Sequence, residues 1–134
     1  MSANGRVQSE AGFRGTLVVV DDEKVVGDYI KMVLKENGFR VITAMNSRRF
    51  LESQQGISEK IKLVILDRTI PGEDSIQMAM HFHKKFEEIP VLLTSGYSVD
   101  EKTEALLDNE WVSFLPKPFQ LFELLAAIDK LMGV

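Results

Sequence analysis

The chain has 134 residues and a mass of 15.1 kDa, which fits a single globular domain. Hydrophobic residues make up 45% of it and charged residues 27%, and this balance argues against wholesale disorder. The formal net charge of −4 argues against direct nucleic-acid binding through a basic face, and the absence of cysteine excludes disulfides and thiolate metal sites.

Residues 1–14 are predicted to form a flexible leader, and residues 15–134 are predicted to form the folded domain. The segment Met1–Gly12 is rich in small and polar residues and lacks the apolar stretch of a signal peptide. No apolar run approaches the roughly 20 residues that a membrane span needs. Together with the lack of cysteine, which fits a reducing compartment, these features predict a cytoplasmic protein without a membrane partner.

Short apolar runs rich in β-branched residues alternate with longer stretches that have helical spacing. Three of the apolar runs show almost no polar alternation, which is typical of parallel strands covered on both faces. The predicted strands are Thr16–Val20, Arg40–Thr43, Ile61–Leu66, Pro90–Leu93 and Val112–Leu115.

Five helices are predicted between and after these strands. Asn37-Gly38 is typical of a left-handed helix end. Ser98-Val-Asp-Glu101 resembles a capping box that opens the fourth helix. The apolar residues of the third helix, including Met80, are expected to pack in the core or against a neighbouring helix. The predicted helices are Glu23–Asn37, Ser47–Gln54, Asp74–Phe86, Ser98–Leu107 and Phe119–Met132. The alternating order predicts a doubly wound, five-stranded parallel sheet in a three-layer α/β sandwich.

Polar groups follow four of the five predicted strands. Asp21-Asp22-Glu23 follows the first, Asp67 the third, Thr94-Ser95 the fourth, and Lys117 lies just after the fifth. Because the carboxyl ends of parallel strands meet at one edge, these groups are expected to share a pocket. A helix cap would explain one of the three adjacent carboxylates but not all of them. A hard cation with oxygen ligands, Mg²⁺ or Mn²⁺, would neutralise them.

Four separated motifs resemble the receiver domain of two-component response regulators. They are Asp21-Asp22, Asp67 with Pro71 four residues later, Thr94-Ser95, and Lys117-Pro118-Phe119. The resemblance covers about Gly15–Gly133 and is closest to receivers attached to hybrid histidine kinases. It implies a flavodoxin-like (βα)5 fold and a role in a two-component phosphorelay.

The resemblance also implies a phosphoacceptor site. Asp67 would take a phosphoryl group from a phosphohistidine. Asp21, Asp22 and Asp67, with the backbone carbonyl of Thr69, would hold Mg²⁺ or Mn²⁺. Lys117, preceding a cis proline, would pair with Asp67 and then with a phosphoryl oxygen.

A switching mechanism is implied as well. The Thr94 hydroxyl would donate to the phosphoryl group, and Phe114 would change rotamer. Their movement would remodel the face formed by the fourth helix, the fifth strand and the fifth helix. Phe114 lacks the hydroxyl of the tyrosine often found at this position, so its switching would depend on packing alone.

The implied partners are a histidine kinase or histidine phosphotransfer protein as donor and an unknown downstream protein. The chain would be a monomer or an activation-dependent dimer, and it would not be an enzyme beyond accepting and losing its own phosphoryl group. The alternative is a phosphorylation-independent interaction module with the same fold. A phosphohydrolase ranks last, because Thr69, two residues after Asp67, offers no carboxylate for acid–base catalysis.

The loop after Asp67 departs from the usual pattern of the family. Arg68 replaces an apolar residue and Ser75 replaces a glycine. Arg68 is expected to point into solvent and pair with Glu73, or alternatively to help neutralise the phosphoryl charge. Gly72 is expected to supply the backbone freedom that Ser75 lacks.

Overall fold

The fold comes from a computed structural model that describes residues 12–53 and 60–133. Strands and helices alternate along the chain, as the sequence predicts. The strands are β1 (Gly15–Val20), β2 (Phe39–Ala44), β3 (Ile61–Asp67), β4 (Val91–Ser95) and β5 (Val112–Pro116). The helices are α2 (Lys24–Lys35), α3 (Ser47–Ser53), α4 (Ser75–Lys85), α5 (Glu101–Leu106) and α6 (Leu121–Met132).

All five strands form one parallel sheet in the order β2-β1-β3-β4-β5. This order confirms the doubly wound topology, in which the switch point lies between β1 and β3. The register places Asp67 directly opposite Thr94, and Thr94 opposite Leu115. The carboxyl ends of β1, β3, β4 and β5 therefore lie side by side, where the polar groups of the sequence are found.

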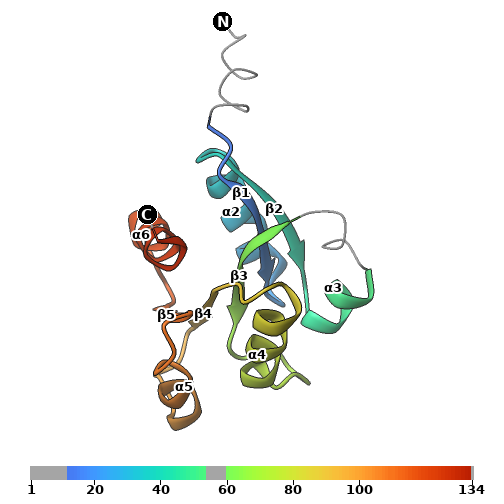
Figure 1. Cartoon of the computed structure of the whole chain (residues 1–134), viewed down its shortest axis with the longest axis vertical. Helices are drawn as coiled ribbons and strands as arrows, with labels where there is room; N and C mark the ends of the chain where they lie inside the picture. The colour runs from blue at the N-terminus through green and yellow to red at the C-terminus, as the bar shows by residue number, and fades with distance from the viewer. Residues whose placement is uncertain (1–11, 54–59, 134) are drawn as a thin grey trace, which may run out of the picture.

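The sheet is covered on both faces by helices (Figure 1). One buried cluster joins side chains of β1, β3 and β4 to Leu34 of α2 and Leu124 of α6. The other joins alternate side chains of the same strands to Phe50 of α3, Phe82 of α4 and Leu106 of α5. Two apolar layers explain why β1, β3 and β4 are apolar without alternation, since both faces of each are buried.

Two details of the predicted helices are wrong. Met80 is 43% exposed, because the buried stripe of α4 runs through Ser75, Ala79 and Phe82 and the next residue after Ala79 faces solvent. The N-cap of α5 is Asp100, whose side chain accepts from the N–H of Thr103, and the helix therefore starts after Asp100 rather than near Ser98.

The predicted leader lies largely outside the described residues, but its last residue contacts the domain. The N–H of Arg14 donates to the carbonyl of Gly38 at 2.8 Å, and its guanidinium pairs with Asp129 and lies over the ring of Phe39. Gly38 has φ 93°, the left-handed conformation predicted for the end of the first helix. Within the described residues, no helix has both the length and the apolar character to cross a bilayer.

Candidate functional site

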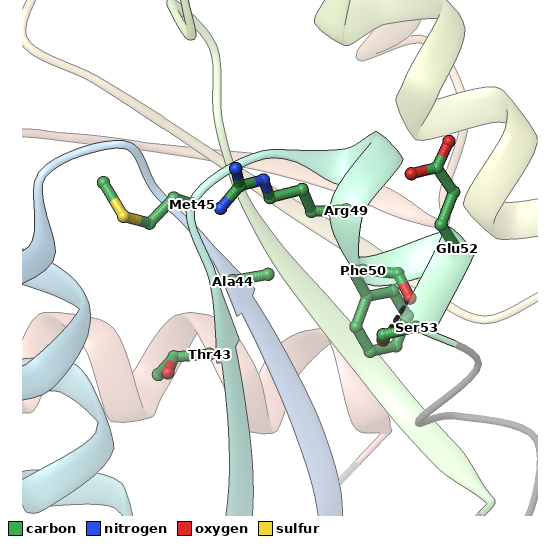
Figure 2. Close-up of a pocket in the computed structure, with 7 residues that line it drawn as sticks. All are labelled: Thr43, Ala44, Met45, Arg49, Phe50, Glu52 and Ser53. Atoms are coloured by element: carbon green, nitrogen blue, oxygen red, sulfur yellow. Dashed lines mark hydrogen bonds between the residues drawn. The ribbon is translucent and has the colours of Figure 1, made fainter.

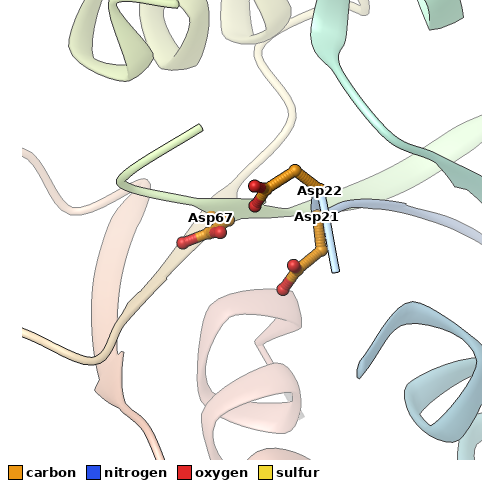
Figure 3. A group of neighbouring side chains, drawn as sticks. All are labelled: Asp21, Asp22 and Asp67. Carbon is orange, nitrogen blue, oxygen red and sulfur yellow. The ribbon is translucent and has the colours of Figure 1, made fainter. Parts of the chain in front are cut away.

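Three carboxylates gather at the carboxyl edge of the sheet. Asp21 and Asp22 follow β1, and Asp67 is the last residue of β3. One oxygen of each lies within 4.8 Å of the others, and Figure 3 shows the three side chains grouped at the strand ends. Asp21 and Asp67 are buried, and Asp22 is half-buried. The structure therefore brings the three predicted carboxylates together at this edge of the sheet.

Backbone hydrogen bonds hold the two buried carboxylates in place. The N–H of Asp21 donates to the carbonyl of Ala44 at 3.0 Å, which prolongs the β1–β2 pairing by one residue. Oδ1 of Asp21 accepts from the N–H of Glu23 at 2.9 Å. Oδ1 of Asp67 accepts from the N–H of Thr69 at 3.3 Å. The sheet and its turns therefore fix where the charges lie.

Lys117 places its ammonium among these carboxylates. Its Nζ donates to Oδ2 of Asp21 at 2.9 Å and lies 3.7 Å from Oδ2 of Asp67 and from Oε1 of Glu23. The N–H of Lys117 donates to the carbonyl of Ser95 at 2.8 Å, and the Lys117-Pro118 peptide bond is cis, as predicted. The predicted pairing with Asp67 is present, but Asp21 is the nearer partner.

The carboxylates and the ammonium perturb each other's ionisation. Burial, together with the nearby charge of Asp21, raises the pKa of Asp67 to about 6, although Lys117 opposes the shift. Burial alone would lower the pKa of Lys117, but the hydrogen bond and charge of Asp21 outweigh it, and the pKa is raised. The pocket thus holds more negative charge than its one ammonium neutralises.

The arrangement fits a small divalent cation. Mg²⁺ binds oxygens at about 2.1 Å in octahedral geometry, so two oxygens on one ion lie about 3 to 4 Å apart. The observed limit of 4.8 Å between Asp21, Asp22 and Asp67 needs only a small rotation of a carboxylate, or a water between one of them and the ion. Thr69 is exposed beside Asp67, and the role of its carbonyl as a ligand stays a prediction.

The two predicted switch residues lie on neighbouring strands. Thr94 is 1% exposed and lies opposite Asp67 in the β3–β4 register. Phe114 in β5 is half-buried and packs against the cluster that includes Leu106 of α5. The structure therefore places Thr94 next to β3 and Phe114 next to α5.

The loop between Asp67 and α4 differs from the prediction. Arg68 does not pair with Glu73. It bonds Asp100 at 2.7 Å, while Oε1 of Glu73 accepts from the N–H groups of Ser47 and Arg48 at the start of α3. Gly72 does adopt a positive φ, 81°, as predicted.

Sequence reasoning missed the partners of Arg68, which are Ser75, Asp100 and Thr103. Arg68 and Ser75 were both singled out as departures, but nothing in the pattern links them across seven residues. The spacing of Asp100 and Thr103 is that of an N-cap and its N3 position, and this signal could have located the start of α5.

A hollow of about 550 Å³ lies between β2 and α3, away from the three carboxylates (Figure 2). It contains none of the three clustered carboxylates. Its exposed charged side chains are Arg49 and Glu52, and Ser53 Oγ donates to the carbonyl of Phe50 at 2.7 Å. Without a buried charged group it has no feature that predicts chemistry. Its lining residues are Thr43, Ala44, Met45, Arg49, Phe50, Glu52 and Ser53.

Solved receiver structures share this fold. A response regulator from Thermotoga maritima is 27% identical and superposes with a TM-score of 0.71, covering 91% of this chain and all of its own. The receiver domain of the hybrid histidine kinase CckA is 25% identical with a TM-score of 0.71, covering 88% of this chain and 99% of its own.

Curated relatives are similar over most of this chain. The response regulator MprA of Mycolicibacterium vanbaalenii is 33% identical over 117 residues, and the uncharacterized transcriptional regulatory protein YbdJ of Bacillus subtilis is 31% identical over 122 residues. These matches cover 87% and 90% of this chain but 49% and 51% of the relatives, so the chain spans about half their length. The pattern of the family described as the response regulator receiver domain matches residues 17–129. The chain belongs to the response regulator receiver domain family.

Proposed function

We propose that the chain is the phosphoacceptor module of a two-component phosphorelay, and that Asp67 receives the phosphoryl group. The observation that carries the proposal is the gathering of Asp21, Asp22 and Asp67 around the ammonium of Lys117. An acidic set of this kind suits a hard cation, and the matched family gives it a signalling role. The donor is a phosphohistidine on a histidine kinase or a histidine phosphotransfer protein.

In the proposed transfer, a carboxylate oxygen of Asp67 forms a bond to phosphorus. The bond between phosphorus and the imidazole nitrogen of the donor breaks, and the imidazole takes a proton from solvent. Bound Mg²⁺ supplies positive charge that neutralises the carboxylates and the phosphoryl oxygens. Lys117 neutralises a further phosphoryl oxygen, and the N–H of Thr69 orients Asp67 through its hydrogen bond to Oδ1.

The proposed consequence is a change at the surface of α5, β5 and α6. The hydroxyl of Thr94 donates to a phosphoryl oxygen, and Phe114 follows by repacking beside α5. The altered surface then engages a downstream protein. Three relatives carry the word transcriptional in their names, and the match covers about half of each, so an output domain that acts on DNA is one kind of partner. The net charge of −4 argues against direct DNA binding by this chain.

Acetyl phosphate with Mg²⁺ tests this proposal, because a small phosphodonor needs no partner protein. We expect intact mass spectrometry to show one added phosphoryl group on the wild type and on Asp108→Asn, whose carboxylate is exposed on the surface. A chelator of divalent cations should prevent the addition. A wild type that is folded and Mg²⁺-loaded but takes no phosphoryl group would favour the phosphorylation-independent interaction module instead.

A further inference from the structure

The guanidinium of Arg68 contacts two helices at once. Its Nε donates to Oγ1 of Thr103 at 2.9 Å, and its Nη1 donates to Oγ of Ser75 at 3.0 Å. Its Nη2 donates to Oδ2 of Asp100 at 2.7 Å. The Arg68 side chain is 18% exposed and the Asp100 side chain 53%, so the ion pair is partly open to solvent, whereas Ser75 and Thr103 are buried. We call these three hydrogen bonds the Arg68 tie.

The acceptors of the Arg68 tie are themselves held in place. Ser75 is fully buried, and its Oγ donates back to the carbonyl of Arg68 at 2.6 Å. Oδ1 of Asp100 accepts from the N–H of Thr103 at 2.9 Å and so caps α5. One oxygen of Asp100 thus caps the helix while the other binds Arg68. The start of α5 is therefore fixed against the loop that follows the phosphoacceptor.

Arg68 also binds β4 through its main chain. Its N–H donates to the carbonyl of Thr94 at 2.7 Å. Arg68 therefore contacts Thr94 just before the connection between β4 and α5, residues 96–100, and Asp100 at its end. Beyond Ser95 this connection has no regular secondary structure, and Tyr97 on it is 72% exposed. A movement of the connection relative to β3 would have to lengthen or break the Arg68 tie.

We propose that the Arg68 tie stabilises the unphosphorylated position of α5 and is broken when Asp67 carries a phosphoryl group. The inference rests on the proposed function, in which the Thr94 hydroxyl donates to that group, and it adds that the connection after Thr94 moves with it. Arg68 is then a positioning residue, since it acts through Asp100 and α5. An interaction present only in the unphosphorylated arrangement weakens the binding of any ligand that selects the other arrangement, and its removal strengthens that binding.

Two single variants weaken the Arg68 tie to different extents, because Arg68→Met removes all three hydrogen bonds and Asp100→Asn removes only the ion pair with Asp100. Arg68→Met removes the charge and the donors but keeps an unbranched side chain. Asp100→Asn removes the charge, and Asn remains a good N-cap for α5. The probe is beryllofluoride with Mg²⁺, a non-covalent phosphoryl mimic, and its affinity is measured by calorimetry. Each variant should bind it about fivefold to tenfold more tightly than the wild type.

The double variant should gain nothing beyond Arg68→Met, because the contact that Asp100→Asn removes is one of the three that Arg68→Met removes. Arg68→Lys keeps a charge but loses the planar fork and should show a smaller gain. Arg48→Met, which changes an exposed cation on α3, should bind like the wild type. Mere damage to the fold would weaken binding, so a gain in affinity separates positioning from structural support.

Unchanged or weaker binding in folded Arg68→Met and Asp100→Asn would overturn the inference, as would gains that add in the double variant. The proposed function would survive that result if the wild type still accepts a phosphoryl group from acetyl phosphate. A wild type that neither accepts the group nor binds the mimic would overturn the proposed function, and this inference with it.

Discussion

Replacing Asp67 by Asn is expected to make the metal-free protein more stable and, at the same time, unable to accept a phosphoryl group. The side chain of Asp67 is 4% exposed, and burial with the charge of Asp21 raises its pKa from 3.8 to about 6. At pH 7.5 the folded protein must keep this carboxylate ionised beside another. One pKa unit corresponds to about 1.4 kcal/mol, so we expect a gain of about 3 kcal/mol in the free energy of unfolding.

The pH dependence gives this expectation a definite sign. A carboxyl group whose pKa is raised by folding stabilises the fold below its unfolded pKa, and that contribution is lost as the pH rises from 3.8 to about 6. Urea unfolding without divalent cations should therefore show the gain of Asp67→Asn at pH 7.5 and little gain at pH 4. Asp108→Asn is the control and should match the wild type at both pH values. A gain of equal size at pH 4 would contradict the account.

The same variant should lose the reaction itself. An amide offers no anionic oxygen to attack phosphorus, and removal of a nucleophile typically lowers a rate by about 1,000-fold or more. Acetyl phosphate with Mg²⁺ should therefore leave the mass of Asp67→Asn unchanged while the wild type gains a phosphoryl group. If Asp67→Asn is more stable but still accepts a phosphoryl group, Asp67 is not the nucleophile.

Replacing Lys117 by Met should lower stability and phosphoryl acceptance while strengthening Mg²⁺ binding. The Lys117 ammonium is 16% exposed and lies 2.9 Å from Asp21 and 3.7 Å from Asp67. Without it the buried carboxylates repel each other unopposed, and the metal-free protein should lose about 3 kcal/mol. A divalent cation would then meet no competing charge, and Mg²⁺ should bind about tenfold more tightly. Phosphoryl acceptance should fall about 100-fold, because the transition state loses a fixed cation.

Calorimetry measures the expected gain in Mg²⁺ affinity, and the initial rate of phosphorylation by acetyl phosphate measures the expected loss of phosphoryl acceptance. Lys31→Met is the matched control, since Lys31 is exposed on α2 away from the cluster, and it should change neither. Weaker Mg²⁺ binding by Lys117→Met would mean that the lysine organises the metal site. An unchanged rate would mean that it plays no part in the transfer.

Most of the fold and the clustering of the carboxylates could be predicted, because they follow from the pattern of apolar runs and from the order of the strands. The apolar runs of β1, β3 and β4 are buried on both faces, which leaves no polar alternation. Parallel topology then brings Asp21, Asp67 and Lys117 together without any knowledge of side-chain contacts. The edge of the sheet at which they meet follows from strand order alone.

The contacts of Arg68 could not be predicted in the same way. They depend on where α5 starts in space, and that helix has six residues and a weak apolar pattern. Its cap, Asp100, is 32 residues from Arg68, and such a pairing leaves no periodic signal. Glu73 is the nearer charge in sequence, but its Oε1 accepts from the N–H groups of Ser47 and Arg48 instead. Specific side-chain pairs across loops depend on how the elements pack in space rather than on the spacing of the residues in the sequence.

The most direct test of the central claim is to locate the phosphoryl group after treatment with acetyl phosphate and Mg²⁺. Tandem mass spectrometry of peptides from the treated wild type should place the group on Asp67, and omission of Mg²⁺ should leave that peptide unmodified. Modification of another residue, or of Asp67 to the same extent without a divalent cation, would contradict an account in which gathered carboxylates and a cation make this one side chain the acceptor.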